Sequence, residues 1–394
     1  MPSSAATPAV APMTRALVLL FAFCCGAIVA NIYYAQPIIA LIAPDVALST
    51  QGASLVVALT QVGYAAGLFF LVPLADLLEN RRLMMATVVL AGLSLLAASV
   101  VSQPGPFLAV SLLIGFSSVA VQMLIPLAAH MAPEASRGRV VGSIMSGLIL
   151  GILLARPLAS LVADHFGWRA VYQLAAAAML VILLVLATTM PAYRPAHRAS
   201  YPALIASLGH LFKRHALLRQ RAMLQALMFA AFSLFWTAAP LELARVHGLS
   251  QSQIAVFALV GAVGTVAAPL AGRWADAGYT RLATLAAMLM AIVAFTLGLA
   301  PSVVCLALTG VLLDFAVQMN MVMGQREIYA LDAHSRARLN GIYVTSIFLG
   351  GAAGSALASP VYESLGWPGI AGIGMALGVL GWLGSRRSAR AANA

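Results

Sequence analysis

Long apolar runs recur along almost the whole chain, and they restrict its fold more than any other feature. Twelve runs can be marked, at about residues 17–42, 55–77, 83–102, 107–131, 140–163, 169–190, 220–245, 252–275, 282–300, 302–327, 339–361 and 368–385. A transmembrane helix needs about 20 mainly apolar residues. A barrel strand would instead alternate apolar and polar residues, and these runs do not. The sequence therefore predicts an all-α membrane protein with 12 transmembrane helices.

Composition agrees with a lipid environment. The chain is 62% hydrophobic and 8% charged, and its mean hydropathy is +0.97. A soluble domain carries about 25% charged residues. We therefore expect the lipid bilayer to be the main partner of the surface.

The net charge of +11 follows a topological pattern. Eight arginines lie in or beside alternate short loops: Arg81, Arg82, Arg137, Arg139, Arg273, Arg281, Arg336 and Arg338. Such a bias indicates the cytoplasmic side of a membrane protein. It predicts that both termini are cytoplasmic, and it explains the basic balance without nucleic acid as a partner.

An internal repeat relates residues 136–168 to residues 335–367 by a shift of 199 positions without a gap. Each copy contains a basic loop, an apolar run with spaced glycines and a closing Gly-Trp pair. Repeats of this kind indicate a duplicated architecture. We expect two bundles of six helices that run in the same direction, residues 1–190 and 220–394. The polar segment 191–219 would be a cytoplasmic linker.

The loop after the second run carries a motif. Its first copy reads Leu74-Ala75-Asp76, followed by Arg81 and Arg82, and the second half contains Gly272-Arg273-Trp274-Ala275-Asp276. These strings resemble the loop signature of the major facilitator superfamily, which implies two six-helix bundles and alternating access. The resemblance implies that Asp76, Arg81, Arg82, Arg273 and Asp276 form a cytoplasmic gate. The alternative is a set of cytoplasmic salt bridges with no switching role.

Two charged residues lie deep within apolar runs, away from the ends of the runs. Asp314 lies near the middle of its run, and Arg156 lies in the first copy of the repeat, where the second copy has Ser355. Charged groups within a membrane are costly and indicate function by default. We expect Asp314 to carry a proton and Arg156 to compete for it or to bind substrate. The alternative for Arg156 is that its side chain extends to the outer membrane surface.

Polar and aromatic residues at helical spacing predict the lining of a substrate cavity. Gln318 and Gln325 share a face with Asp314, whereas Asn31 and Tyr34 are one turn apart. The full predicted lining also contains Gln61, Gln122, Trp236 and Tyr343. Hydrogen bonding between helices would explain the polar residues equally well, and a packed core would explain the aromatic ones.

The short strings Asn31–Pro37, Leu313–Gln318 and Arg338–Asn340 resemble the bacterial drug or metabolite:proton antiporter branch of the superfamily. Many exporters of the family carry an arginine where Ser111 stands here, so another residue would have to couple protons. The resemblance implies proton-coupled efflux of small organic molecules by a monomer in the bacterial inner membrane. Proton-coupled uptake of a small organic anion is the alternative.

Other classes of function find little support in the residues. We find no nucleophile elbow, no phosphate-binding loop and no metal-ligand spacing, and the seven histidines are scattered. We therefore expect no enzymatic activity, no cofactor and no metal. A membrane sensor or assembly subunit is a further alternative, but the chain shows no soluble signalling domain.

Overall fold

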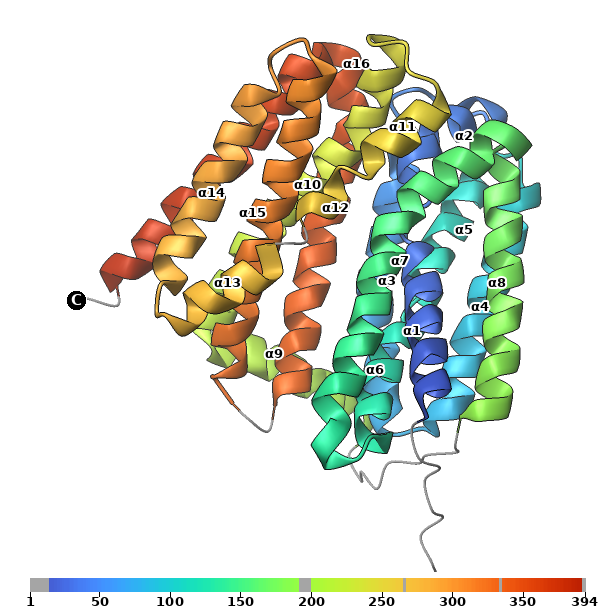
Figure 1. Cartoon of the computed structure of the whole chain (residues 1–394), viewed down its shortest axis with the longest axis vertical. Helices are drawn as coiled ribbons and strands as arrows, with labels where there is room; N and C mark the ends of the chain where they lie inside the picture. The colour runs from blue at the N-terminus through green and yellow to red at the C-terminus, as the bar shows by residue number, and fades with distance from the viewer. Residues whose placement is uncertain (1–13, 191–199, 265–266, 333–334, 392–394) are drawn as a thin grey trace, which may run out of the picture.

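The computed structural model describes residues 14–190, 200–264, 267–332 and 335–391. All regular elements within these residues are helical (Figure 1). The first half contains α1 (Arg15–Ala30), η1 (Gln36–Ile38), α2 (Ile39–Asp45), α3 (Leu55–Phe70), η2 (Val72–Asp76), α4 (Asn80–Val100), α5 (Pro104–Ser117), α6 (Ala120–Met131), η3 (Glu134–Ser136), α7 (Arg137–Phe166) and α8 (Trp168–Thr189). Helix α9 (Tyr201–Arg214) follows.

The second half contains α10 (Ala216–Arg245), α11 (Gln251–Ala258), α12 (Gly261–Gly264), α13 (Ala267–Asp276), α14 (Thr280–Leu297), α15 (Val303–Tyr329) and α16 (Arg336–Ala391). In α16 two helices join across Gly366, whose backbone is not helical. Within the described residues, nine segments are long and apolar enough to cross a bilayer. The expected count of 12 crossings stays a prediction.

Several expected spans are interrupted, and two of them are each divided into three helical elements. The run 17–42 forms α1, a turn, η1 and α2 in succession, and the run 252–275 is divided among α11, α12 and α13. Such interruptions are tolerated at membrane depth where neighbouring helices shield the backbone.

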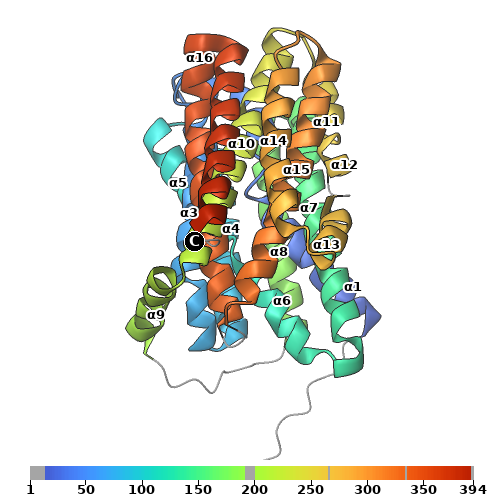
Figure 2. The ribbon, with the colours of Figure 1, turned by 90° about the vertical axis from the view of Figure 1, so that its left-hand side faces the viewer.

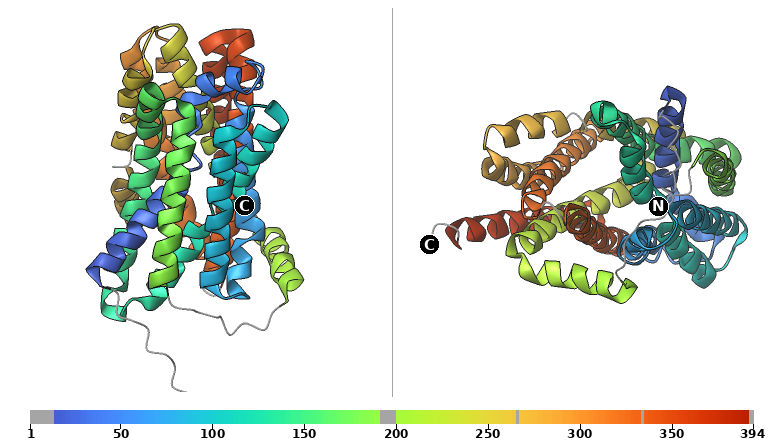
Figure 3. Two further views of the ribbon diagram at one scale, coloured as in Figure 1. Left: turned by 90° about the vertical axis from the view of Figure 1, so that its right-hand side faces the viewer. Right: turned by 90° about the horizontal axis from the view of Figure 1, so that it is seen from below.

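Helices pack mainly within each half. Contacts join α1 with α7, α3 with α5 and α4 with α8 in the first half, and α10 with α16 and α14 with α15 in the second. Seen from below, the blue-to-green helices and the yellow-to-red helices form two groups (Figure 3, right). The main contacts between the halves are α3 with α16 and α7 with α11.

Glycines bring the paired helices into close approach. A Cβ atom added to Gly151 of α7 would overlap the carbonyl oxygen of Gly26 in α1. A Cβ atom added to Gly350 of α16 would overlap the carbonyl oxygen of Ala226 in α10. Small residues at such crossings are typical of helix pairs in membranes. Because Gly151 and Gly350 are repeat equivalents, both halves use the same packing device.

The two ends of the molecule differ. Helices α2 and α11 lie at the upper end in Figure 1, which we call the α2 end. Helix α9 lies across the opposite end, which we call the α9 end, and it runs along the outside of the bundle (Figure 2). It contacts η2 of the first half and α10 and α16 of the second.

Candidate functional site

Three side chains meet where the two halves face each other: Arg156 of α7, Trp236 of α10 and Asp314 of α15. Arg156 and Trp236 are 4% and 2% exposed. The guanidinium carbon of Arg156 lies 4.7 Å from the centre of the Trp236 ring. The indole nitrogen of Trp236 donates a hydrogen bond of 2.9 Å to Asp314 Oδ1. Trp236 therefore contacts both predicted charged residues, and we call these three the central cluster.

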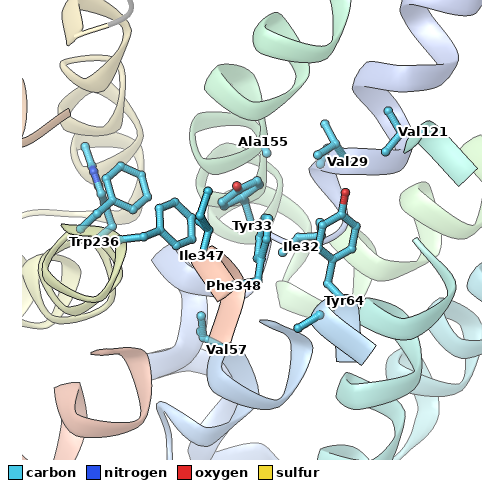
Figure 4. Packing of buried hydrophobic residues seen from close by; sticks show 14 of the residues in the cluster. Val29, Ile32, Tyr33, Val57, Tyr64, Val121, Ala155, Trp236, Ile347 and Phe348 are labelled. Carbon is cyan, nitrogen blue, oxygen red and sulfur yellow. The ribbon is translucent and has the colours of Figure 1, made fainter. Parts of the chain in front are cut away.

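The guanidinium of Arg156 is enclosed by rings and one amide. Its Nε donates to Gln36 Oε1 at 2.7 Å, and its Cζ lies 5.0 Å from the ring centre of Tyr33 and 5.3 Å from that of Phe232. Tyr33 and Trp236 are labelled in Figure 4. Cation–π contacts with desolvated cations contribute about 2 kcal/mol. The side chain therefore lies inside the protein and does not extend to the outer surface.

Two hydrogen-bond donors around the Arg156 guanidinium have no acceptor among the described residues. Arg156 Nη2 and Gln36 Nε2 are buried and have no hydrogen-bond partner within the described part of the chain. A buried donor without a partner costs about 1–3 kcal/mol. An acceptor brought by a ligand would recover that cost.

Asp314 is held by the close approach of α12. A Cβ atom added to Gly264 would overlap Asp314 Cβ, and one added to Gly261 would lie 2.5 Å from Asp314 Oδ2. Only glycine allows this approach, so the short helix packs directly on the carboxylate. Asp314 Oδ1 accepts the hydrogen bond from Trp236, whereas Asp314 Oδ2 lies against the backbone of α12.

The predicted cavity residues of the first half are dispersed. Helix α1 ends at Ala30, so Asn31 and Tyr34 lie in a turn and not on a continuous helix. Asn31 Nδ2 donates to Ser118 Oγ at 3.3 Å and to Met179 Sδ at 3.6 Å, which places it between helices of its own half. Tyr34 is partly buried.

Gln122 and Gln61 lie closer to the second half. Gln122 Nε2 donates to Tyr64 Oη at 3.1 Å, and the Tyr64 ring lies edge-on to Phe348 of α16, with centres 4.5 Å apart (Figure 4). Gln61 Nε2 donates to Ser233 Oγ of α10 at 3.2 Å, and its Oε1 accepts from Ser355 Oγ of α16 at 3.3 Å. Gln61 therefore connects the two halves directly.

In the second half, Gln318 is partly exposed one turn beyond Asp314. Gln325 lies further toward the α9 end, where its Nε2 donates to Asn340 Oδ1 at 3.5 Å. Tyr343 is fully buried, and its hydroxyl lies close to Gly324. The structure thus gathers Asp314, Arg156 and Trp236, while Gln325 and Tyr343 lie between α15 and α16.

The hydrogen bonds between the halves lie between mid-length and the α2 end, among the residues that the structure describes. Besides Gln61, they involve Ser54, whose Oγ donates to Ala356 O at 3.4 Å and accepts from the Ser359 amide at 3.2 Å. Ser252 Oγ of α11 donates to the carboxylate of Asp164 in α7. The halves are therefore tied together on that side of the central cluster.

Of the predicted gate residues, Arg81 contacts another helix near the α9 end. The guanidinium of Arg81 donates to the carbonyl of Ala187 in the last turn of α8, where a cation is favoured by the helix dipole. Arg82 pairs with Glu79 at 3.1 Å. Asp76 lies in η2, Arg273 is exposed on α13, and the side chain of Asp276 lies outside the described residues.

Sequence reasoning missed several partners. Gln36, Tyr33 and Phe232 complete the surroundings of Arg156. Arg221 of α10 pairs with Glu327 of α15 near the α9 end. The spacing of Tyr33 and Gln36, one turn apart beside Pro37, could have suggested a common site. The pairing of Arg221 with Glu327 had no signal in the sequence.

The sequence pattern of the Major Facilitator Superfamily matches residues 18–355, and a further match covers residues 221–393. The chain belongs to the Major Facilitator Superfamily. It is therefore a multi-pass membrane protein of a transporter family, and its function is transport and not catalysis.

Curated relatives agree with the superfamily assignment. The chain is 39% identical over 363 residues to the "Uncharacterized transporter YgaY" of Escherichia coli O157:H7, which covers 91% of this chain and 92% of the relative. It is 32% identical over 374 residues to a "Probable transporter" of Streptomyces coelicolor, which covers 93% and 86%.

Solved structures share the superfamily fold. A mutant of the nucleoside transporter NupG superposes with a TM-score of 0.74 and 14% identity, covering 93% of this chain and 99% of that chain. A bacterial homologue of the human lysosomal transporter Spinster, in an inward-facing and unoccupied conformation, gives a TM-score of 0.67 and 15% identity, covering 94% and 96%. At these identities the likeness concerns the fold alone.

Proposed function

We propose that this chain is a secondary active transporter that exports small organic molecules in exchange for protons by alternating access. It would cross the bacterial inner membrane 12 times as a monomer, with both termini in the cytoplasm. Residues 1–190 and 220–394 would form the two six-helix bundles, joined by a cytoplasmic linker at 191–219. The bacterial relatives and the arginine-rich alternate loops support this placement.

One observation carries the proposal: Trp236 contacts both Arg156 of the first half and Asp314 of the second. When Asp314 takes up a proton, the negative charge beside the indole is lost, while the guanidinium of Arg156 keeps its charge. The electrostatic balance across the interface therefore depends on the proton. Protonation of Asp314 would therefore change the electrostatic interaction between the two halves and would favour one arrangement of the bundles over the other.

Alternating access requires an interface that can separate. The ties at Gln61, Ser54 and Asp164 use neutral groups or one exposed carboxylate, and each is a single hydrogen bond or a pair. Hydrogen bonds of this kind contribute about 0.5–1.5 kcal/mol each. The α2 end would be closed here and would open when these bonds break.

The proposed gate would act at the opposite end. Asp76, Arg81 and Arg82 in the first half and Arg273 and Asp276 in the second would latch neighbouring helices. The contact of Arg81 with the end of α8 supports such a role, because it ties α4 to another helix of the same half.

The test is proton movement that depends on substrate. A thermal-shift screen of small organic compounds would first identify a ligand of the purified protein. Proteoliposomes containing a pH-sensitive dye would then report proton flux when that ligand is added under an imposed pH gradient. We expect Asp314→Asn to lose gradient-driven accumulation but to retain exchange of labelled for unlabelled ligand.

The matched control is Glu134→Gln, which removes an exposed carboxylate of η3 and should leave the flux unchanged. Undiminished gradient-driven accumulation by Asp314→Asn would remove Asp314 from the mechanism.

A second candidate function is uptake of a small organic anion with a proton. The unused donors of Arg156 and Gln36 favour it, because a carboxylate would satisfy both. An anion bound with a protonated Asp314 would also leave the site neutral. Counterflow with radiolabelled carboxylates decides between the candidates: trans-stimulated uptake that is lost in Arg156→Gln supports the anion carrier.

A further inference from the structure

Helix α9 has one apolar face that packs on the bundle. Leu204, Leu208 and Leu211 are buried at helical spacing, whereas Lys213 and Arg214 in the last turn are exposed. The apolar face of α9 is therefore buried against the protein, and the cations of its last turn face outward.

The same helix connects the two halves. Tyr201 Oη donates to the carbonyl oxygen of Phe70, at the end of α3, at 2.9 Å. Arg338 Nη1, near the start of α16, donates to Ser207 Oγ at 3.2 Å. Helix α9 is therefore held by one half at its start and by the other at its middle.

A groove of about 210 Å³ lies where these elements meet. It is lined by Phe69, Leu208, Gly209, Phe212, Ile342, Thr345 and Ser346. Gly209 faces open space, because a Cβ atom added there would meet no atom within 4 Å. The hydroxyl of Thr345 is buried and has no hydrogen-bond partner among the described residues. The lining is thus largely apolar, with one donor that is not used.

Cationic groups lie beside the groove. Arg219 donates to the backbone carbonyls of Phe212 and Lys213, which fixes the end of α9. The side chains of Lys213 and Arg214 are exposed, and no carboxylate of the described residues pairs with them. The sequence has no Asp or Glu between Asp164 and Glu242. This end of α9 therefore presents two exposed cations that no carboxylate of the described residues pairs with.

We propose that the groove binds an anionic phospholipid from the leaflet that faces α9. An acyl chain occupies the groove, and the headgroup phosphate lies beside Lys213 and Arg214. Basic residues near an anionic leaflet are attracted to its negative surface potential. Because the groove is lined by α3 and α16 as well as α9, the bound lipid contacts both halves and favours the arrangement seen here.

Lys213 provides a site-specific probe, since it is the only lysine in the chain. The full-length protein is placed in nanodiscs of phosphatidylcholine, or of equal parts phosphatidylcholine and phosphatidylglycerol. Acylation of Lys213 by acetic anhydride, a neutral reagent, is followed by peptide mass spectrometry. We expect a severalfold slower reaction with phosphatidylglycerol present. Equal rates in the two lipids would overturn the proposal.

Gly209→Leu tests the groove, because its new side chain enters the space that an acyl chain would occupy. It should abolish the protection of Lys213 by phosphatidylglycerol. Gly138→Leu is the matched control, since that glycine of α7 also has no atom within 4 Å of an added Cβ. Protection that survives Gly209→Leu would show that the headgroup is held without the groove and would overturn the proposed site.

Arg214→Gln tests the charge while leaving the probe in place. It should reduce the protection of Lys213 and the amount of phosphatidylglycerol retained after extraction, as measured by native mass spectrometry. Arg139→Gln removes an exposed arginine of α7 and should change neither. An equal effect of both variants would indicate diffuse surface charge and would contradict a site. These measurements do not require transport, so their outcome is separate from that of the proposed function.

Discussion

The two copies of the repeat, residues 136–168 and 335–367, agree in backbone at their ends and differ in the side chain at mid-length. Gly167 has φ 81° and ψ 157°, and its equivalent Gly366 has φ 63° and ψ −160°. This region of backbone conformation is open to almost no residue but glycine. Both copies therefore end in the same sharp change of direction.

The copies also use the same contacts at their ends. Arg137 Nε donates to the carbonyl oxygen of Ala129 at 3.0 Å, and Arg336 Nε donates to that of Tyr329 at 3.1 Å. Each carbonyl belongs to the last turn of the preceding long helix. The residues that the two copies share thus fix how helices begin and end.

At mid-length the equivalent residues are Arg156 and Ser355, and each points to the opposite half. Arg156 contacts Trp236 and Phe232, whereas Ser355 donates to Gln61. The duplicated scaffold therefore brings one position of each copy to the interface, and the residue at that position has diverged. This comparison teaches that shared positions report on architecture, and that unshared positions at the interface report on function.

The largest effect is expected for Arg156→Ser. This substitution gives the first copy of the repeat the residue that the second copy has at the equivalent position, Ser355. It leaves Gln36 Oε1 without its charged donor, and such hydrogen bonds contribute about 1.5–3 kcal/mol. We expect a loss of substrate flux of about 10- to 100-fold. Ser355→Ala removes only neutral hydrogen bonds, so its flux should fall severalfold. Substrate flux in proteoliposomes, normalised to the amount of folded protein, measures the loss in each variant. Equal losses would contradict the different roles given to Arg156 and Ser355.

The second test is Gly167→Ala against Gly366→Ala. Each substitution forces an unfavourable backbone conformation, at a cost of about 1–3 kcal/mol. We expect similar losses of thermal stability in the two variants and unchanged flux per folded molecule. A variant that kept full stability would show that its copy does not need the conformation.

Much of this architecture could be predicted from the sequence. The apolar runs gave the approximate position of every long helix, and the shift of 199 residues identified equivalent positions such as Arg156 and Ser355. Hydrophobic periodicity reports the depth and the face of a residue on its own helix. It therefore led to the prediction that Asp314 and Arg156 would face the space between the two halves and not the lipid.

Periodicity does not report which face of another helix lies opposite. For this reason the position of Trp236 between Arg156 and Asp314, and the bonds of Gln61 to the second half, could not be predicted. The interruption of the first span after Ala30 was also missed, because the polar residues from Asn31 to Gln36 were taken as one face of a continuous helix. Asn31 and Tyr34 were consequently placed on one face of a continuous helix, whereas residues 31–35 form turns.

A smaller effect is expected at the basic loops. Arg137→Gln and Arg336→Gln each remove a cation from the end of a preceding helix, an interaction that contributes about 0.3–1 kcal/mol. We expect equal, small decreases in thermal stability, and a further decrease in the double variant that equals their sum. The control is Arg281→Gln, an exposed arginine outside the repeat. Unequal decreases would show that the two loops have different structural roles.

The smallest effect concerns the tryptophans that close the two copies. Trp168 Nε1 donates to Asp45 Oδ2 at 2.9 Å, whereas Trp367 Nε1 donates to the carbonyl oxygen of Gly298 at 2.7 Å. The hydrogen bond from Trp168, together with Arg169, lowers the pKa of the Asp45 carboxyl below its ordinary value of 3.8. A lowered folded-state pKa stabilises the protein above the ordinary value, and this contribution is lost as pH falls through the folded-state pKa.

The contact of Trp168 should therefore weaken in acid, while that of Trp367 should not, because a backbone carbonyl does not titrate. We expect the stability difference between wild type and Asp45→Asn to be small at neutral pH and to vanish as pH falls below 3.8. The cost of Trp367→Phe should stay constant over the same range. Thermal unfolding followed by tryptophan fluorescence measures both. If the loss of stability caused by Trp367→Phe depended on pH, a titrating group, and not the carbonyl of Gly298, would be the hydrogen-bond partner of Trp367.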